Sequence, residues 1–90
     1  MIENLLHVAK HKTRMYAKAY RWPEEYLITQ LVSRIHCITE AYGKDYNGRE
    51  SHIIAKAYQG VTQLVQRTKP AEKERLFPPN KFPELYWGNR

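Results

Sequence analysis

Hydrophobic residues recur every three or four positions along residues 2–20, which is the spacing of one face of an α-helix. The members of this apolar stripe are Ile2, Leu5, Leu6, Ala9, Thr13, Tyr16, Ala17 and Tyr20. A second face is basic along its length and carries His7, Lys10, His11, Arg14, Lys18 and Arg21. The pattern predicts an amphipathic N-terminal helix within residues 1–21, with a continuous basic stripe on one side.

A second helix is predicted from Pro23 to about Tyr42. Proline suits the first turn of a helix, and the acids Glu24 and Glu25 lie where the helix dipole favours negative charge. One side of this segment is apolar and consists of Leu27, Ile28, Leu31, Ile35 and Ile38. Gly43 suits the end of the helix, because glycine readily adopts the left-handed conformation found there.

A short turn at residues 43–48 leads to a third predicted helix, from about Arg49 to Thr68, which Pro70 closes. Its apolar face consists of Ile53, Ile54, Ala57, Val61, Leu64 and Val65. Its polar face carries Lys56, Gln59, Gln63 and Arg67. Two helices of this length joined by a short turn favour a long antiparallel hairpin over residues 22–69.

The last segment, residues 70–90, combines prolines with apolar side chains. Pro78, Pro79 and Pro83 argue against a regular helix, because proline lacks the backbone N–H that a helix interior needs. The apolar members are Leu76, Phe77, Phe82, Leu85, Tyr86 and Trp87. We therefore expect an extended tail that docks on the hairpin or on a neighbouring subunit. The expected fold is a single all-α domain, residues 1–90, with the N-terminal helix packed on the hairpin.

Composition describes a small basic protein. The chain has 90 residues and a formal net charge of +6, from 15 Lys and Arg against 9 Asp and Glu. Its seven Tyr favour surfaces that stack on planar groups, as well as cores. A chain of this size buries a modest share of its surface and often gains support by oligomerising. These properties favour an anionic partner.

The single cysteine, Cys37, excludes an internal disulfide and points to a reducing compartment. Its neighbours Ile35 and Ile38 are apolar, so we expect a buried and inert thiol. No apolar run approaches the roughly 18 residues that cross a membrane, and residues 1–12 lack the order of a signal peptide. We expect a soluble cytosolic protein that does not bind a membrane.

The sequence lacks recognisable catalytic and metal-binding patterns. No nucleophile stands beside a base in an identifiable arrangement, and neither a Gly-rich phosphate loop nor an HExxH motif occurs. His7 and His11 are spaced to chelate, but they stand among lysines and without the four ligands of a structural zinc site. We expect no enzyme activity, no metal and no cofactor.

Two features favour a binding surface. The first is the basic stripe beside Tyr16, Tyr20 and Trp22, because rings next to cations can hold bases and phosphates. A merely solvated face is the alternative; Tyr16 is expected in the core, and Tyr20 suits either position. The second feature is Gly60, which costs a helix roughly 1 kcal/mol relative to Ala. It indicates close approach of a ligand or another backbone, unless it is a tolerated surface glycine.

Two stretches resemble a known protein family. Ala19-Tyr20-Arg21 leads through Glu24 and Glu25 into a helix, and Ala57-Tyr58-Gln59-Gly60-Val61 leads through Leu64-Val65 to Pro70. They resemble the helical hairpin of phage cyclic-nucleotide sponges of the anti-CBASS protein 2 type, a hairpin shared with the anti-Thoeris sponges. The resemblance covers about 50 residues, from Tyr20 to Pro70.

The resemblance implies a homo-oligomer, assembled as dimers and then as a hexamer that is a trimer of dimers. Such proteins bind cyclic dinucleotides such as 3′,3′-cyclic GMP–AMP (cGAMP), and also cyclic trinucleotides, without degrading them. In the family an aromatic ring stacks on a base, while basic and hydroxyl groups hold the phosphates at sites between subunits. This chain would then be a phage anti-defence protein in the cytoplasm of the infected bacterial host.

The resemblance also assigns ligand-binding residues. The family's tyrosine and arginine at the start of the hairpin fall on Tyr20 and Arg21, and its later basic residue falls on Arg34. Its Gln-Gly pair falls on Gln59 and Gly60. With the donors beside Gly60, the expected ligand-binding set is Tyr16, Lys18, Tyr20, Arg21, Arg34, Lys56, Gln59, Gly60, Gln63 and Arg67.

The chain departs from the family pattern at two places. The family's arginine before the Gln-Gly pair has no counterpart here, and Lys56 is the nearest cation. The family's tryptophan near the start of that helix is also missing. Tyr16 or Lys18 is therefore an alternative for the roles assigned to Tyr20 and Arg34.

Two other functions stay open from the residues themselves. A nucleic-acid-binding protein would use the basic stripe from Lys10 to Arg21 on the phosphate backbone, with affinity that falls as salt rises. The acids Glu24, Glu25 and Glu40 argue against a broad surface of this kind. An inhibitor of a host protein would dock its aromatic tail, with anchors at Phe77, Phe82, Tyr86 and Trp87.

Overall fold

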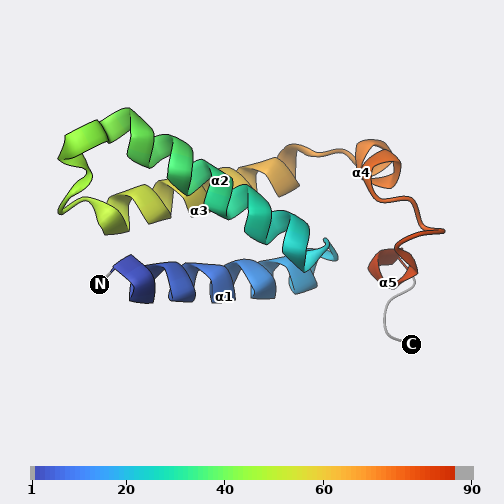
Figure 1. Cartoon of the computed structure of the whole chain (residues 1–90). Helices are drawn as coiled ribbons and strands as arrows, with labels where there is room; N and C mark the ends of the chain where they lie inside the picture. Colours follow the sequence, from blue (N-terminus) through green and yellow to red (C-terminus); the bar gives the residue numbers. More distant parts are fainter. Residues whose placement is uncertain (1, 87–90) are drawn as a thin grey trace.

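The computed structural model describes residues 2–86, with side chains from Asn4 onward. The chain is mostly helical in this part and contains no strand there, so the prediction of an all-α fold is confirmed. The elements are α1 (Ile2–Tyr20), α2 (Glu24–Tyr42), the 3-10 turn η1 (Gly43–Tyr46), α3 (Glu50–Arg67), α4 (Pro70–Leu76) and α5 (Pro83–Tyr86) (Figure 1). No helix of residues 2–86 is both long and apolar enough to cross a lipid bilayer.

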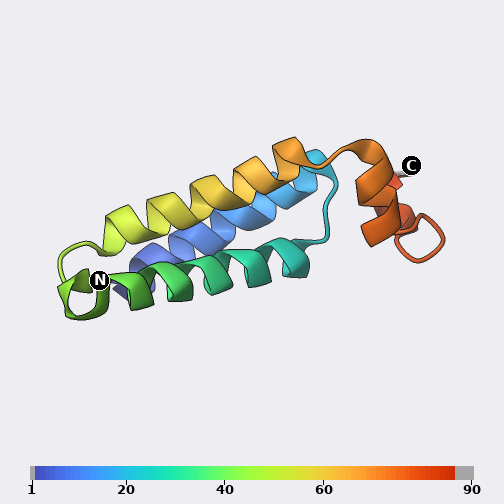
Figure 2. The same ribbon diagram turned by 90° about the horizontal axis from the view of Figure 1, so that it is seen from above.

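The three long helices form an elongated up-down-up bundle. The α2 helix runs antiparallel to α1 and to α3, and each of the three contacts the other two (Figure 2). The two short helices lie together at the end of the bundle where α1 ends and α2 begins (Figures 1 and 2). The described chain measures 46 × 22 × 17 Å along its principal axes.

Small side chains on α1 explain how closely the helices pack. Ala9, Thr13 and Ala17 follow each other at four-residue spacing and are buried. The Thr13 hydroxyl donates to the backbone oxygen of Ala9 at 2.8 Å, so its burial leaves no hydroxyl group without a partner. Larger side chains of the other two helices fill the space opposite them, including Leu27, Leu31, Ile54 and Val61.

The link between α1 and α2 is tight and carries a left-handed residue. Arg21 has a φ of 60°, and the Trp22 backbone N–H donates to Ala17 O at 2.8 Å, as in a Schellman motif. Glycine usually occupies this position, because a side chain there costs roughly 1–2 kcal/mol. Pro23 is the residue before α2 rather than part of its first turn, and the first helical residues are Glu24 and Glu25.

The tail differs from the extended segment predicted above, because it folds into α4 and α5. Pro70 and Pro83 are the first residues of these helices, where a missing N–H costs no hydrogen bond. Phe77 and Leu85 are buried, and Phe82 is half-buried. Tyr86 is half-buried as well and Leu76 is exposed, whereas the last predicted tail residue, Trp87, lies outside the described residues.

Aromatic rings attach this tail to the bundle. Trp22 was expected beside the basic stripe as a stacking ring, but it is only 4% exposed and belongs to the core. Its ring meets Phe77 edge-on, with ring centroids 5.4 Å apart, and Tyr26 meets the same Phe77 ring at 4.9 Å. The tail therefore covers Trp22, a contact that periodicity within single helices could not indicate.

A partly buried lysine completes this corner. The Lys73 ammonium donates to the backbone oxygen of Tyr20 at 3.3 Å, at the C-terminal end of α1. It also lies 6.0 Å from the ring centroid of Trp22 and 5.2 Å from that of Tyr86. Burial, and then the charge of Arg21, lower the pKa of Lys73 from its ordinary value. The lysine thus fastens α4 to the end of α1.

The prediction that Cys37 is buried is wrong. Cys37 is exposed, although its neighbours Ile35 and Ile38 are partly buried. Two residues correspond to about 200° around a helix, so position 37 points away from position 35. An apolar neighbour in the sequence is therefore a poor guide to burial within a helix.

Candidate functional site

Arg34 on α2 lies across Gly60 on α3. A Cβ atom at position 60 would lie 2.9 Å from Nη1, 3.1 Å from Cδ and 3.3 Å from Cζ of Arg34. The first of these distances is shorter than real Cβ contacts allow, so the arginine keeps its place only because residue 60 is glycine. Close approach at Gly60 was expected from a ligand or another backbone; within this chain the neighbour is an arginine side chain.

The Arg34 guanidinium has donors to spare. Its Nε is buried and has no hydrogen-bond partner among the described residues. Within that same part of the chain, no carboxylate lies within 4.0 Å of a guanidinium nitrogen of Arg34 or Arg67. A buried donor without a partner costs about 1–3 kcal/mol, so an acceptor placed beside it would recover that energy.

A hollow of about 300 Å³ lies beside this arginine, between α2, α3 and the start of α4. We call it the Arg34 hollow. It brings together four of the ten predicted ligand-binding residues, which are Arg34, Gly60, Gln63 and Arg67. Sequence reasoning missed the other three lining residues, which are Leu64, Thr68 and Glu72. Glu72 comes from α4, and the tail was not expected to be helical.

The chemistry of the Arg34 hollow suits an anion. Two guanidinium groups and one amide can donate to phosphate oxygens, and arginine donates in a geometry that matches them. The single carboxylate, from Glu72, is engaged at the start of α4, where it accepts from the Lys69 backbone N–H at 3.1 Å. The Thr68 hydroxyl is also engaged, because it donates to Leu64 O at 2.7 Å.

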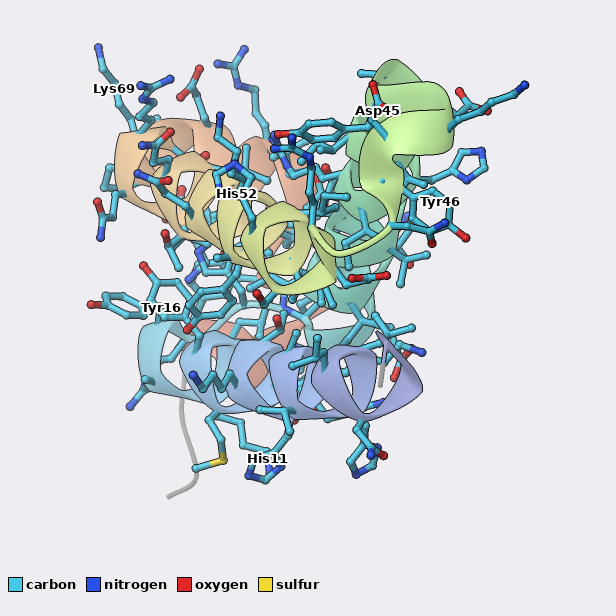
Figure 3. All side chains as sticks on the ribbon, turned by 90° about the vertical axis from the view of Figure 1, so that its left-hand side faces the viewer. His11, Tyr16, Asp45, Tyr46, His52 and Lys69 are labelled. Carbon is cyan, nitrogen blue, oxygen red and sulfur yellow. The ribbon has the colours of Figure 1, made fainter. Side chains whose placement is uncertain are left out.

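Tyr16 and Tyr20 form a pair at the end of α1, with ring centroids 4.4 Å apart. Tyr16 is half-buried between α1 and α3 (Figure 3), and its hydroxyl donates to Thr62 O at 3.4 Å. Burial raises the pKa of Tyr16, and a hydrogen bond from Gln66 partly offsets the rise. Tyr20 is half-exposed, so part of its surface is accessible for stacking.

The tyrosine pair and the Arg34 hollow lie on different sides of α3. Tyr16 bonds to Thr62, whereas Arg34 covers Gly60, and two residues correspond to about 200° around a helix. A single chain therefore does not bring Tyr20 and Arg34 into one pocket. Lys56 and Gln59 are exposed on α3 and do not line the Arg34 hollow.

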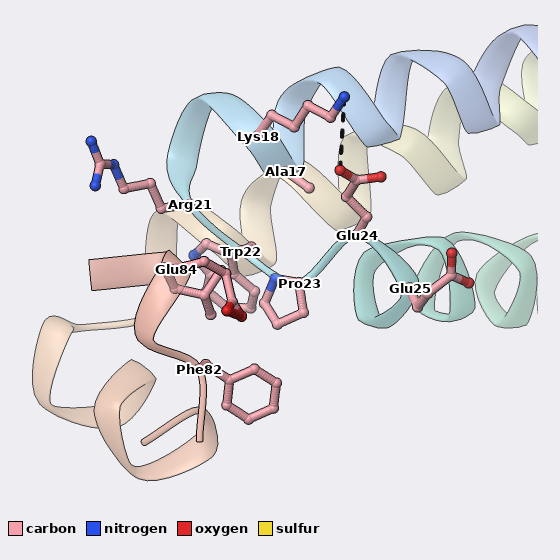
Figure 4. A pocket seen from close by; sticks show the side chains of 10 residues that line it. Ala17, Lys18, Arg21, Trp22, Pro23, Glu24, Glu25, Phe82 and Glu84 are labelled. Atoms are coloured by element: carbon pink, nitrogen blue, oxygen red, sulfur yellow. Dashed lines mark ion pairs between the residues drawn. The ribbon is translucent and has the colours of Figure 1, made fainter. Parts of the chain in front are cut away.

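The last two predicted residues, Lys18 and Arg21, border a larger hollow of about 760 Å³. It lies where α1, α2 and α5 meet (Figure 4), and we call it the junction hollow. Its other charged lining residues are all acids, namely Glu24, Glu25 and Glu84. The apolar lining residues are Ala17, Trp22, Pro23, Phe82 and Leu85. This composition does not suit a phosphate.

The basic stripe of α1 is partly neutralised at the same place. Arg14 contacts Glu24 at 3.4 Å and Glu25 at 3.1 Å, and the Lys18 ammonium lies 3.9 Å from Glu24 (Figure 4 shows the latter pair). Hydrogen bonds to Glu25 and then Glu24 raise the pKa of Arg14. Two of the four Lys and Arg residues of the basic stripe, Arg14 and Lys18, are therefore already paired with acids.

The exposed histidines of α1 stand apart from other metal ligands. His11 points away from α2 and α3 (Figure 3), and His7 is exposed as well. Within the described part of the chain, no three His, Cys, Asp or Glu side chains are grouped so that they could hold a metal ion.

Comparisons of this chain with protein-family models, curated proteins and solved structures give no match. Any functional proposal therefore rests on the residues and the geometry described above.

Proposed function

We propose that this protein binds cyclic di- and trinucleotides and withholds them from their effectors, as a phage anti-defence sponge. The observation that carries the proposal is the Arg34 hollow. There Arg34 and Arg67 stand on facing helices with donors that no described carboxylate occupies, and Gly60 keeps one of them in place. A phosphodiester of the ligand would satisfy these donors.

Stacking would come from the other side of the bundle. The accessible face of Tyr20 can hold a purine, supported from behind by Tyr16. Because Tyr20 and the Arg34 hollow lie on different sides of α3, one ligand would contact two protomers. A homo-oligomer, built as dimers and then as a hexamer, would bring the two half-sites together and exclude water from the polar contacts.

The proposed mechanism is binding without chemistry. The ligand would leave intact, and the protein would act by lowering its free concentration in the cytoplasm of the infected bacterium. A sponge competes with high-affinity effectors, so rigid and preorganised half-sites on long helices favour this role.

Titration calorimetry with 3′,3′-cGAMP tests the proposal, with a short DNA duplex as the comparison ligand. We expect saturable binding of the cyclic dinucleotide that tolerates salt, and recovery of the intact nucleotide by chromatography. Arg34→Ala should weaken binding at least tenfold, because it removes a charge-assisted contact to a phosphate. Arg49→Ala removes the same charge at the far end of the bundle, where Arg49 covers the Tyr42 ring, and should bind normally.

Absence of heat with any cyclic nucleotide, together with DNA binding that weakens steeply as salt rises, would contradict the proposal and favour the nucleic-acid alternative. Analytical ultracentrifugation tests the assembly separately. A protein that binds the nucleotide as a monomer would refute the shared site while leaving the ligand class in place.

A further inference from the structure

The junction hollow differs in charge from the rest of the molecule. The chain carries a formal net charge of +6, and this hollow is lined by three carboxylates and two cations, with Arg14 paired from beside it to two of those carboxylates. One of those cations, Arg21, extends away from the hollow, and the Lys18 ammonium is held by Glu24 (Figure 4). The hollow thus presents carboxylates on a basic protein, although cations pair with two of the three.

The three acids of this site differ in whether a cation pairs with them. Glu24 and Glu25 face Arg14 and Lys18 across the α1–α2 link. Glu84, at the start of α5, makes no ion pair within residues 2–86. In Figure 4 its carboxylate lies beside the Pro23 ring, on the side of the hollow opposite the Lys18 pair. Its negative charge therefore has no counterpart within the site.

The remaining walls of the hollow are apolar. The Pro23 ring lies beside the Glu84 carboxylate and the Phe82 ring lies below it in Figure 4, and Ala17, Leu85 and Trp22 also line the hollow. The volume of about 760 Å³ lies within the range of small-molecule sites, which combine mostly apolar walls with a few placed polar groups. Size and lining thus describe a ligand with an apolar body.

We propose that the junction hollow binds a small organic cation, an ammonium group carried on an apolar body. The ammonium is held by Glu84, and the apolar body rests on Phe82 and Pro23. This site is separate from the Arg34 hollow in position, and among the described residues it offers an unpaired carboxylate where that hollow offers unpaired guanidinium groups. The inference therefore goes beyond the proposed function and stands whether or not cyclic nucleotides bind.

Phenethylammonium is a suitable probe, and 3-phenylpropionate is its matched control because it has a similar apolar body and the opposite charge. We would titrate each into ¹⁵N-labelled protein and follow amide shifts by NMR, with the Trp22 indole N–H as a reporter in the hollow. Phenethylammonium should give saturable shifts at residues 82–85 and Trp22, and 3-phenylpropionate should give none there.

Two variants test whether the Glu84 carboxylate binds the ammonium. Glu84→Gln should weaken phenethylammonium binding about tenfold, because it removes the charge-assisted partner of the ammonium. Glu40→Gln removes the same charge from the distal end of α2 and should bind as the wild type does. An overlay of amide spectra checks that each variant is folded.

Three results would overturn the proposal. These are linear, unsaturable shifts with phenethylammonium, equal shifts with 3-phenylpropionate, and unchanged affinity in folded Glu84→Gln. The first two use only the wild-type protein, so they hold even if the variant fails to fold. Shifts at Arg34 and Arg67 on addition of 3′,3′-cGAMP report on the other hollow, which keeps failure of one site distinct from failure of the other.

Discussion

The two hollows are each lined by two cations but differ in what faces those cations. At the junction hollow Lys18 borders acids that begin α2, where a helix dipole favours negative charge. At the Arg34 hollow the cations come from the middle of α2 and the last turn of α3, far from those acids. Its one carboxylate is engaged with the backbone of the tail. Cations that lie beside the acidic start of a helix form ion pairs there, whereas cations far from such a start stay available to a ligand.

This difference also separates stability from binding. The junction end of the bundle holds the buried aromatic cluster, and changes to those buried rings should act mainly on folding. The Arg34 hollow is partly open and bordered by long side chains, and changes there should act mainly on ligand affinity. Substitutions at both ends of the bundle test this division, from the largest expected effect to the smallest.

Trp22→Ala should destabilise the protein by about 3–5 kcal/mol, because it removes a large buried ring from the contact with Phe77. Urea unfolding followed by circular dichroism measures the change. Leu76→Ala is the control, since Leu76 lies on α4 but is 52% exposed, and it should cost much less. Similar losses in the two variants would mean that the tail does not cover Trp22.

Gly60→Ala should weaken cyclic dinucleotide binding about tenfold, because the new Cβ displaces the Arg34 guanidinium from the hollow. Folding should be unaffected or improve by up to about 1 kcal/mol, since alanine favours a helix and a long side chain can move aside. Calorimetry and thermal unfolding separate the two effects. Ser51→Ala, an exposed change on the same helix, should leave affinity unchanged. Normal binding by Gly60→Ala would show that the position of Arg34 is unimportant.

Replacing both Glu24 and Glu25 by Gln should release Arg14 and Lys18 and make the junction more basic. We expect tighter binding of duplex DNA, with a dependence of log affinity on log salt that is steeper by about 2. Fluorescence anisotropy at several salt concentrations measures this slope. The control with Glu40 and Glu50 replaced changes the net charge equally without freeing either cation. An equal gain in the control would assign the effect to overall charge.

Tyr86→Phe should flatten the loss of stability in alkaline solution. Burial, and then the charge of Glu74, raise the pKa of Tyr86 above its ordinary value of 10.0. The stabilising contribution of Tyr86 to the free energy of unfolding is therefore complete below pH 10, and it is lost as pH rises through the folded-state pKa of Tyr86. Unfolding free energies between pH 8 and 11 test this, and Lys73 titrates in both proteins, so the difference isolates Tyr86. Parallel curves would contradict the prediction.

The same substitution should cost about 1 kcal/mol at neutral pH, because the Tyr86 hydroxyl donates to Phe77 O at 2.7 Å. Tyr16, whose pKa is also raised by burial, should keep part of the alkaline loss in the variant.

The three long helices could be predicted because each carries a complete apolar stripe with a period near 3.6 residues. Their observed bounds differ from the predicted ones by no more than one or two residues. The tail could not be predicted, because proline both ends helices and begins them. Pro70 and Pro83 can begin helices because the N–H of a first helical residue has no acceptor within its own helix, so its absence costs no hydrogen bond.

The candidate site was only partly predictable. Gly60 signalled a close neighbour, but which neighbour depends on how α2 is rotated against α3, and no local pattern fixes that rotation. Lys18 and Arg21 looked available because the sequence does not show the acids of α2 and α5 around the junction hollow. Trp22 looked like a surface ring for a similar reason, since the residue that covers it, Phe77, lies 55 positions further along the chain.

The left-handed link at Arg21 has a consequence for protein engineering. Each of the three residues between α1 and α2 has its own task, since Arg21 reverses the chain, Trp22 enters the core and Pro23 precedes the next helix. An inserted residue would pull the tryptophan away from the tail. The turn at residues 43–48, in contrast, has no buried side chain. That turn is where a fluorophore, a tag or new chain ends can be introduced with both hollows left intact.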